Sequence, residues 1–174
     1  MAKRNAVTDK LPPGKVKYGM DLQTFLPYVM YRFAGKMAQA GHKLSDLLQE
    51  TGVAIGEREW RIISLLGAYG GLTNGRLAEL LVTDAATITR GVKVLKELEF
   101  IDTKNSKRDK RRILIYLTEK GADFHDRITP RRIETGELIE SCFSYEEKEQ
   151  LFHLLHKLSR HLEHLENELD DEWE

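Results

Sequence analysis

Cysteine and long apolar runs are nearly absent from this chain of 174 residues. Cys142 is the only cysteine, so no disulfide can form within the chain, and a reducing compartment is expected. No stretch approaches the roughly 18 apolar residues that a membrane-spanning helix needs. The N-terminus is basic but lacks the apolar segment of a signal peptide. The sequence therefore predicts a cytoplasmic protein with no membrane partner.

Motifs of enzymes and of cofactor sites are also missing. The chain has no phosphate-binding loop, no G-x-S-x-G motif and no HExxH motif. Four histidines near the C-terminus form two pairs spaced i, i+3, but most lie opposite the apolar stripe of their helix, so exposed positions are favoured over a zinc site. These are His153, His156, His161 and His164. We expect no enzyme activity, no metal and no cofactor.

Cys142 is expected to be a buried apolar side chain rather than a redox switch, because no second cysteine is present to pair with it.

An excess of charge of either sign is lacking as well, since the net charge is −1. The charges are nevertheless segregated along the chain. The first seventeen residues hold five lysines and arginines against Asp9 alone, and the last twelve hold seven acidic residues with no lysine or arginine. We expect residues 1–20 to form a disordered basic arm and residues 170–174 an acidic tail. A third cluster, KNSKRDKRR, spans Lys104 to Arg112.

Helical spacing of apolar residues dominates the first hundred residues. It predicts helices from Thr24 to about Gln49 and from Gly56 to Leu66. Thr73 is a suitable N-cap for a short helix up to Leu81, and a longer helix is expected from Ala85 to Leu98. The break between the last two is about three residues long. Two helices joined by so short a turn form a helix-turn-helix unit.

The helix expected from Ala85 to Leu98 has two different faces. One is an apolar stripe formed by Ile88, Val92, Leu95 and Leu98. The opposite face carries small side chains near the start of the helix and cationic side chains further on. It contains Ala86, Thr89, Arg90, Lys93 and Lys96. No acidic residue occurs on that face before Glu97.

The basic cluster lies between two strand-like segments, 101–103 and 112–117, which predict a β-hairpin with a charged tip. DNA phosphates attract such cations, so the tip is expected to lie along a DNA backbone. Asp109 beside Arg111 can hold that guanidinium by two hydrogen bonds, which prepares it to enter a narrow minor groove. The alternative is a solvated hairpin tip, which the neighbouring helix-turn-helix disfavours.

Two long helices are expected after the hairpin. The first begins at Thr118, carries Gly121 as a tolerable flaw, and should kink or break at Pro130. Ser144 and Glu147 form a capping box that starts the second. In that helix, leucines alternate at spacings of four and three: Leu151, Leu155, Leu158, Leu162, Leu165 and Leu169. Such a seam packs either within the chain or against a second chain, and its place after a DNA-binding lobe favours a dimer.

Several of these segments together resemble the MarR family of bacterial transcription regulators. The resemblance rests on Glu59–Ile63, Leu72–Leu81, Ala86–Arg90, Asp109–Arg111 and Tyr116–Gly121, and it covers roughly residues 22–168. It implies a homodimer that binds a pseudo-palindromic operator and is often released by a small ligand. It also implies that Thr87, Thr89 and Arg90 meet the major groove and that Arg111 meets the minor groove. Gly91 departs from the pattern, because family members usually carry a bulkier residue there. It either softens the helix or permits the close approach of a neighbour.

The predicted fold is mainly α with a β-hairpin wing, a winged helix-turn-helix with a helical dimerisation lobe. Residues 53–121 form the DNA-binding lobe, and residues 21–52 and 122–169 form the dimerisation lobe. The candidate DNA-binding residues are Thr73, Asn74, Ala86, Thr87, Thr89, Arg90, Lys93, Lys107, Arg108, Asp109 and Arg111. The candidate effector-binding residues are Tyr28, Tyr31, Arg32, His42, Trp60 and Arg61. An aromatic or acyl anion would suit that mixture of aromatic rings and cations.

The expected function is a sequence-specific, ligand-released repressor whose partners are operator DNA, a second copy of the chain and a small effector. Two alternatives come from other classes. A constitutive architectural DNA-binding protein would show little preference among sequences and no release by a ligand. A winged-helix module that contacts protein would lack a steep salt dependence on DNA.

Overall fold

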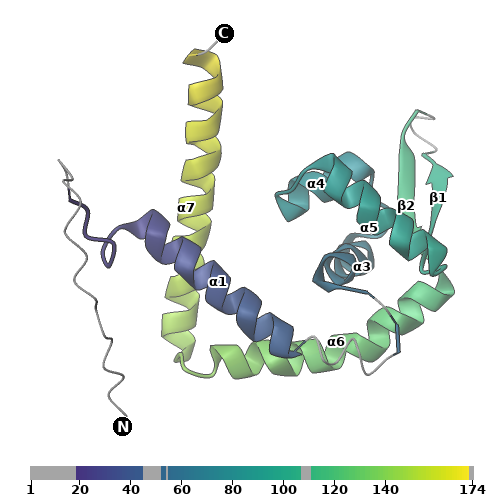
Figure 1. The fold of residues 1–174 in the computed structure, drawn as a ribbon, viewed down its shortest axis with the longest axis horizontal. Helices are drawn as coiled ribbons and strands as arrows, with labels where there is room; N and C mark the ends of the chain where they lie inside the picture. The colour runs from purple at the N-terminus through teal and green to yellow at the C-terminus, as the bar shows by residue number, and fades with distance from the viewer. Residues whose placement is uncertain (1–18, 45–51, 54, 107–110, 173–174) are drawn as a thin grey trace, which may run out of the picture. The chain divides into compact units, whose positions relative to one another are not determined.

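The computed structural model describes residues 19–44, 52–53, 55–106 and 111–172. The chain divides into two compact units, residues 1–43 and 44–174. Helix α1 (Leu26–Leu44) belongs to the first unit. The second contains α3 (Glu57–Tyr69), α4 (Asn74–Leu81), α5 (Ala85–Glu97), α6 (Glu119–Glu140) and α7 (Tyr145–Glu172), with strands β1 (Ile101–Asn105) and β2 (Ile113–Leu117) between α5 and α6 (Figure 1). The predicted class, mainly helical with one hairpin, is confirmed.

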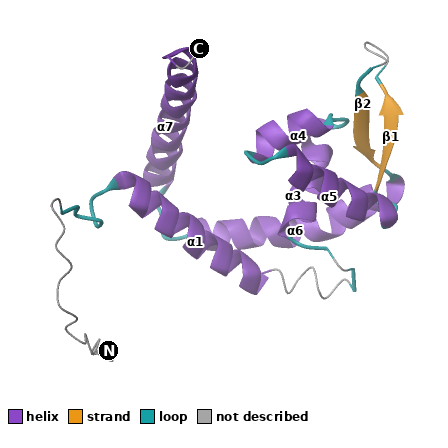
Figure 2. Ribbon diagram, turned by 45° about the horizontal axis from the view of Figure 1, so that its top comes forward, coloured by secondary structure: helices purple, strands orange, loops and turns teal. Residues whose placement is uncertain are grey.

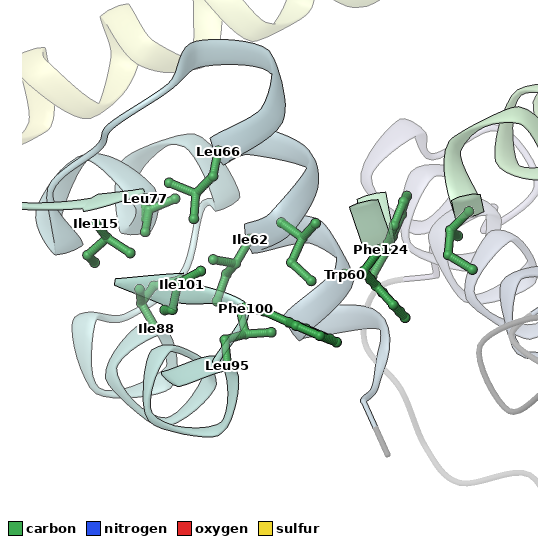
Figure 3. Packing of buried hydrophobic residues seen from close by; sticks show 12 residues of the cluster. Trp60, Ile62, Leu66, Leu77, Ile88, Leu95, Phe100, Ile101, Ile115 and Phe124 are labelled. Atoms are coloured by element: carbon green, nitrogen blue, oxygen red, sulfur yellow. The ribbon is translucent and has the colours of Figure 1, made fainter. Parts of the chain in front are cut away.

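The hydrophobic core of the second unit is built around α3, which contacts α4, α5, α6 and β2 (Figure 2). Ile62 and Ile63 of α3 are fully buried, and they belong to one cluster with side chains from α4, α5, α6 and both strands. Those drawn in Figure 3 include Leu77, Ile88, Leu95, Phe100, Ile115 and Phe124. Burying a side chain of this size stabilises the fold by about 1.5–3 kcal/mol relative to leaving it in water. The core therefore fixes where α5 lies.

Both helices of the helix-turn-helix begin at side-chain caps. Thr73 Oγ1 accepts the N–H of Arg76 at 3.2 Å, and Asp84 Oδ1 accepts the N–H of Thr87 at 2.7 Å. Between them, Val82 adopts a left-handed conformation with φ of 49°. The N-cap expected at Thr73 is confirmed, and the turn occupies the predicted residues 82–84.

The two strands pair antiparallel, with Ile101 opposite Leu117 and Asn105 opposite Ile113. β1 is two residues longer than the sequence predicted, because pairing continues to Asn105. Leu72, in the loop before α4, exchanges two backbone hydrogen bonds with Ile115, at 3.0 and 2.8 Å. This pairing fastens the hairpin to the helix-turn-helix, so the wing and α5 belong to one packed unit.

Helix α6 runs through Pro130 without a break, so of the kink or break expected there the break is excluded. Proline lacks an N–H and costs the helix one hydrogen bond. Contacts on both sides of Pro130 hold the helix against α3: Ile128 is buried, and Arg132 Nη2 lies 2.6 Å from Glu57 Oε2. These tertiary contacts offset the missing bond.

Gly121, which the sequence suggested was a tolerable flaw, is required by a close approach. A Cβ at this position would overlap the carbonyl oxygen of Phe100, and Gly121 itself is buried. The same carbonyl accepts the N–H of Thr118 at 3.0 Å, and the Thr118 hydroxyl accepts the N–H of Gly121 at 3.1 Å. The start of α6 therefore packs directly on the backbone at the end of the helix-turn-helix.

The capping box before α7 is confirmed. Ser144 N donates to Glu147 Oε2 at 2.8 Å, and Glu147 N donates to Ser144 Oγ at 3.2 Å. Cys142 is exposed in the turn between α6 and α7, which corrects the expected burial. None of the described helices is long and apolar enough to cross a membrane.

Replacing Gly121 with alanine should lower the free energy of unfolding strongly. Overpacking costs about 1–3 kcal/mol, and the loss should reach the upper end because the obstructing atom is a backbone carbonyl that cannot rotate away. Gly136→Ala is the matched control in the same helix: a Cβ added at Gly136 would meet no atom within 4 Å, so alanine should stabilise by about 1 kcal/mol. Denaturant unfolding of both variants tests the contact, and equal effects would contradict it.

Candidate nucleic-acid interface

Helix α5 presents one exposed face and one buried face, as the sequence predicted. Ile88, Gly91 and Leu95 are buried. Ala86, Thr89, Arg90 and Lys93 are exposed. The Lys93 side chain is 78% exposed, and its Nζ lies 3.9 Å from Glu97 Oε1. Water and ions therefore reach the face that carries the candidate base-reading residues.

Gly91 allows α5 to approach α3 closely, so the second of its two predicted roles applies. A Cβ at Gly91 would lie 2.7 Å from Cδ1 of Ile62, which is fully buried. Contacts that short require a neighbour to move. The absent side chain thus leaves room for the end of the Ile62 side chain beside the helix that carries the exposed face.

A chain of three hydrogen-bonded side chains runs from the N-cap of α5 into its second turn. Arg90 Nη2 donates to Thr87 Oγ1 at 2.8 Å, and Thr87 Oγ1 donates to Asp84 Oδ2 at 2.7 Å. The Thr87 hydroxyl, followed by the Thr87 backbone N–H, lowers the pKa of Asp84 below its ordinary value. Asp84 therefore stays ionised at neutral pH and remains a hydrogen-bond acceptor.

Asn74 turns its side chain toward α5 and joins the two helices of the motif. Its Nδ2 donates to Thr89 Oγ1 at 3.1 Å and approaches the Ala85 carbonyl oxygen at 3.4 Å. Thr89 Oγ1 in turn donates to the Ala85 carbonyl at 2.8 Å. The candidate residues Asn74 and Thr89 are thus brought together, with Thr73 capping the helix on which Asn74 lies.

The wing presents cations beside α4. Arg111 and Arg112 are exposed, and Lys104 Nζ lies 4.6 Å from the centre of the Tyr116 ring. Lys107, Arg108 and Asp109 lie outside the described residues, so the predicted pairing of Asp109 with Arg111 stays a prediction.

An open groove of about 430 Å³ lies between the start of α4 and β2. Arg76, Glu79 and Arg112 are the charged residues of its lining. Arg76 pairs with Glu79 at 2.7 Å. Arg112 and the N-terminus of α4 therefore supply most of the positive potential that the groove offers to an anion. Sequence reasoning missed Arg76, although its place in the first turn after Thr73 was a usable signal.

The candidate effector residues fall in both units. Tyr28, Tyr31 and Arg32 lie on α1, where a hollow of about 400 Å³ is lined by Tyr28, Arg32, Phe33 and Lys36 among others. Trp60 and Arg61 lie on α3, and the side chain of His42 is outside the described set.

Trp60 is only 7% exposed and packs on α6. Its ring stacks on His125 with centroids 6.0 Å apart, and the Arg132 guanidinium lies 5.3 Å from the ring centre. No sequence pattern indicated these two α6 partners. Within the described ranges, no three His, Cys, Asp or Glu side chains are grouped to hold a metal ion.

Comparison with known proteins places this arrangement among transcriptional regulators. Residues 55–113 match the sequence model of the MarR family. The HTH-type transcriptional regulator BilQ of Clostridium symbiosum (strain WAL-14163) is 30% identical over 113 residues, which are 65% of this chain and 77% of that protein. The uncharacterized HTH-type transcriptional regulator YybA of Bacillus subtilis (strain 168) is 29% identical over 93 residues, 53% of this chain and 62% of that protein.

Solved structures agree with the sequence matches. A MarR/EmrR family transcriptional regulator from Acinetobacter sp. ADP1 superposes with a TM-score of 0.73 at 27% identity, covering 83% of this chain and 99% of that one. The PcaV transcriptional regulator from Streptomyces coelicolor, solved in complex with its natural ligand, shares the fold with a TM-score of 0.64 at 23% identity, covering 82% and 97%.

The contact between Gly91 and Ile62 gives a double-mutant test. Gly91→Ala should destabilise by about 1 kcal/mol net, since the overlap outweighs the better helix propensity of alanine. Ile62→Val alone should cost about 0.5–1.5 kcal/mol. Valine lacks Cδ1, the atom that the new methyl group would meet, so the double variant should lose less than the sum. Denaturant unfolding of all four proteins measures the coupling, and strict additivity would mean that the two positions do not interact.

Proposed function

Because the chain belongs to the MarR family of transcriptional regulators, we propose that it is a homodimeric repressor that binds a pseudo-palindromic operator and is released by a small organic ligand. It is a DNA-binding regulator and not an enzyme. What we propose beyond this is that the protein is a homodimer, that it represses transcription, that a small ligand releases it from DNA, and that it acts in the cytoplasm.

The observation that carries the proposal is the exposed face of α5. Arg90 and Lys93 are exposed there, and the opposite face is locked into the core by Ile88 and Leu95. A helix held in this way can enter a major groove without rearranging, with the residues near its N-terminus against the base edges. Thr89 and Arg90 are then the residues that touch bases, and Lys93 touches phosphate.

The phosphate contacts of the wing supply the sequence-independent part of the affinity. Its cations, with Arg76 and Arg112 in the groove beside α4, face the backbone on either side of the major groove. Neutralising phosphates releases counterions, so binding should weaken steeply as salt is raised. In this scheme Arg111 enters the adjacent minor groove, where a narrow A·T-rich segment attracts an arginine.

A second copy of the chain is proposed to cover the leucine stripe of α7. In the single chain, Leu151, Leu155 and Leu158 are only half-buried, and Leu162 and Leu165 are 49% and 37% exposed. A stripe with heptad spacing is stabilised when a partner helix buries it. We assign residues 21–52 and 122–169 to the dimerisation lobe and residues 53–121 to the DNA-binding lobe. A two-fold dimer would set two copies of α5 about 34 Å apart, one turn of DNA.

The ligand is proposed to be a small aromatic or acyl anion. Tyr28, Tyr31 and Arg32 on α1 are the candidate contacts in the first unit. Trp60 and Arg61 on α3 are separate candidates in the second unit, and the side chain of His42 lies outside the described set. The hollow on α1 has aromatic walls with Arg32 and Lys36 beside them, which suits a ring or chain that carries a carboxylate. A ligand that binds preferentially to a form of the dimer whose α5 helices are misplaced would release the protein from the operator. Its binding free energies for this form and for the DNA-binding form must differ by a few kcal/mol.

Selection of bound sequences from a random duplex library, at two salt concentrations, tests the function. We expect a pseudo-palindrome with half-sites about one turn apart, together with a steep loss of affinity at the higher salt. Binding without a motif would favour a constitutive architectural protein. No binding at low salt would show that the proposed DNA contacts of α5 and the wing are wrong.

Replacing Leu158 with aspartate should give monomers in analytical ultracentrifugation. The change buries a carboxylate in the middle of the proposed helix–helix seam, where desolvation of the charge opposes association. Arg160→Asp is the matched control, because Arg160 is exposed on the same helix and outside the stripe. A Leu158→Asp protein that remains dimeric would assign the seam to contacts within one chain.

A further inference from the structure

We propose that the hydrogen bonds from Arg90 to Thr87 and from Thr87 to Asp84 aim the Arg90 guanidinium before DNA arrives, which makes Thr87 a positioning residue for base recognition. The inference rests on the proposed function, since it concerns how operator sequence is chosen. It assigns Thr87 a different role from the base contact that the family resemblance implies.

The direction of the two hydrogen bonds follows from the donors that each group has. Arginine only donates, and an ionised carboxylate only accepts. Thr87 has a single hydroxyl proton, and with Asp84 Oδ2 at 2.7 Å that proton is directed to the carboxylate. The oxygen lone pairs then face Arg90 Nη2, 2.8 Å away. The lowered pKa of Asp84 keeps this polarity fixed at neutral pH.

The geometry holds Arg90 over the turn that would enter the major groove. Helical side chains point toward the N-terminus of their helix, so a side chain at Arg90 reaches back over Thr87. One of its five N–H groups is used by Thr87, and the others suffice for the two-pronged contact with guanine O6 and N7. Ordering a long side chain beforehand reduces the entropy that DNA binding would otherwise cost.

A direct base contact by Thr87 fits the structure less well. Its side chain is half-buried at the turn, and its hydroxyl already donates once and accepts once. A base edge could take that proton only if the hydroxyl left Asp84. Thr89 shares the exposed face of α5, but its hydroxyl is bonded to Ala85 and Asn74 and not to Arg90. Thr89 therefore provides a matched comparison for Thr87.

The test is a double-mutant cycle with the full-length protein on its selected operator and on operators altered at single base pairs. Arg90→Ala should lower the preference for one base pair in each half-site by roughly tenfold or more. Thr87→Val should lower the preference for that same base pair by about three- to tenfold. In the Arg90→Ala background, Thr87→Val should have almost no further effect. Thr87→Ser should restore the preference, because serine keeps the hydroxyl.

A second double-mutant cycle, which combines Thr89→Val with Arg90→Ala, is the control. It measures the effect of removing a hydroxyl that is not hydrogen-bonded to Arg90. The proposal requires that the effects of Arg90→Ala and Thr87→Val on base-pair preference be coupled much more strongly than those of Arg90→Ala and Thr89→Val. It also requires that Thr87→Val leave the dependence of DNA affinity on salt concentration unchanged. It is overturned if Thr87→Val affects a different base pair from Arg90→Ala, or if the Thr87 and Arg90 effects add. If the wild type selects no sequence at all, the proposed function fails and the positioning role fails with it. A specific wild type with an additive cycle removes the positioning role alone.

A second variant guards against misfolding of Thr87→Val. Asp84→Asn keeps a good N-cap residue, so thermal unfolding should change little. The new amide N–H₂ donates to the Thr87 oxygen where the carboxylate accepted its proton, so the Thr87 hydroxyl loses the acceptor that fixes its orientation. Its released proton then competes for the side that faces Arg90, and the base-pair preference should fall, although by less than in Thr87→Val. An unchanged preference in a protein that binds its operator normally would refute the proposal.

Discussion

The packing of α5 on α3 is the constraint on which the rest of the DNA-binding unit depends. Ile88 and Leu95 are fully buried, and the missing side chain at Gly91 lets α5 come within contact of Ile62. A close-packed interior tolerates few alternative positions, so this contact also fixes the outward face. The same core reaches the hairpin through Ile115, whose backbone pairs with Leu72. Buried apolar contacts thus determine where the exposed cations lie.

Polar contacts then orient the exposed side chains of α5, a helix whose position is set by core packing. Asn74 links α4 to Thr89, and Asp84 links the turn to Thr87 and Arg90. These bonds are exposed to water, so each contributes little to the stability of the fold. Their value lies in restricting side chains that would otherwise sample many rotamers. The buried face of α5 thus contributes stability, and its exposed face would provide the recognition that we propose.

Local patterns were enough to predict the elements, but contacts between distant segments were not. The two faces of α5, the cap at Thr73 and the capping box at Ser144 follow from spacing and residue type within one turn of helix. Gly121 was misjudged because the carbonyl that excludes a side chain belongs to Phe100, 21 residues earlier. Of the kink or break expected at Pro130, the break does not occur, and one contact that holds the helix together there joins Arg132 to Glu57. Cys142 was expected inside as a small apolar residue with no second cysteine to pair with, yet it is exposed in a turn. For the candidate site, the outward residues of α5 were identified, whereas their hydrogen bonds to one another required the structure.

A pre-aimed arginine and a symmetric dimer would act on the same quantity, the gap between specific and non-specific binding. Wing cations that touch phosphate raise affinity for every sequence equally, because phosphates are the same everywhere. The operator would be separated from other DNA by base contacts and by the groove width that Arg111 meets, and a base contact contributes more when its side chain is already ordered. Duplicating the face of α5 across a two-fold axis counts that difference twice, provided that the two helices keep the spacing of one DNA turn. A ligand that changes the spacing would therefore remove specificity first while leaving the phosphate contacts of each wing available. On this reasoning, a released repressor would still bind DNA weakly at low salt, without regard to sequence.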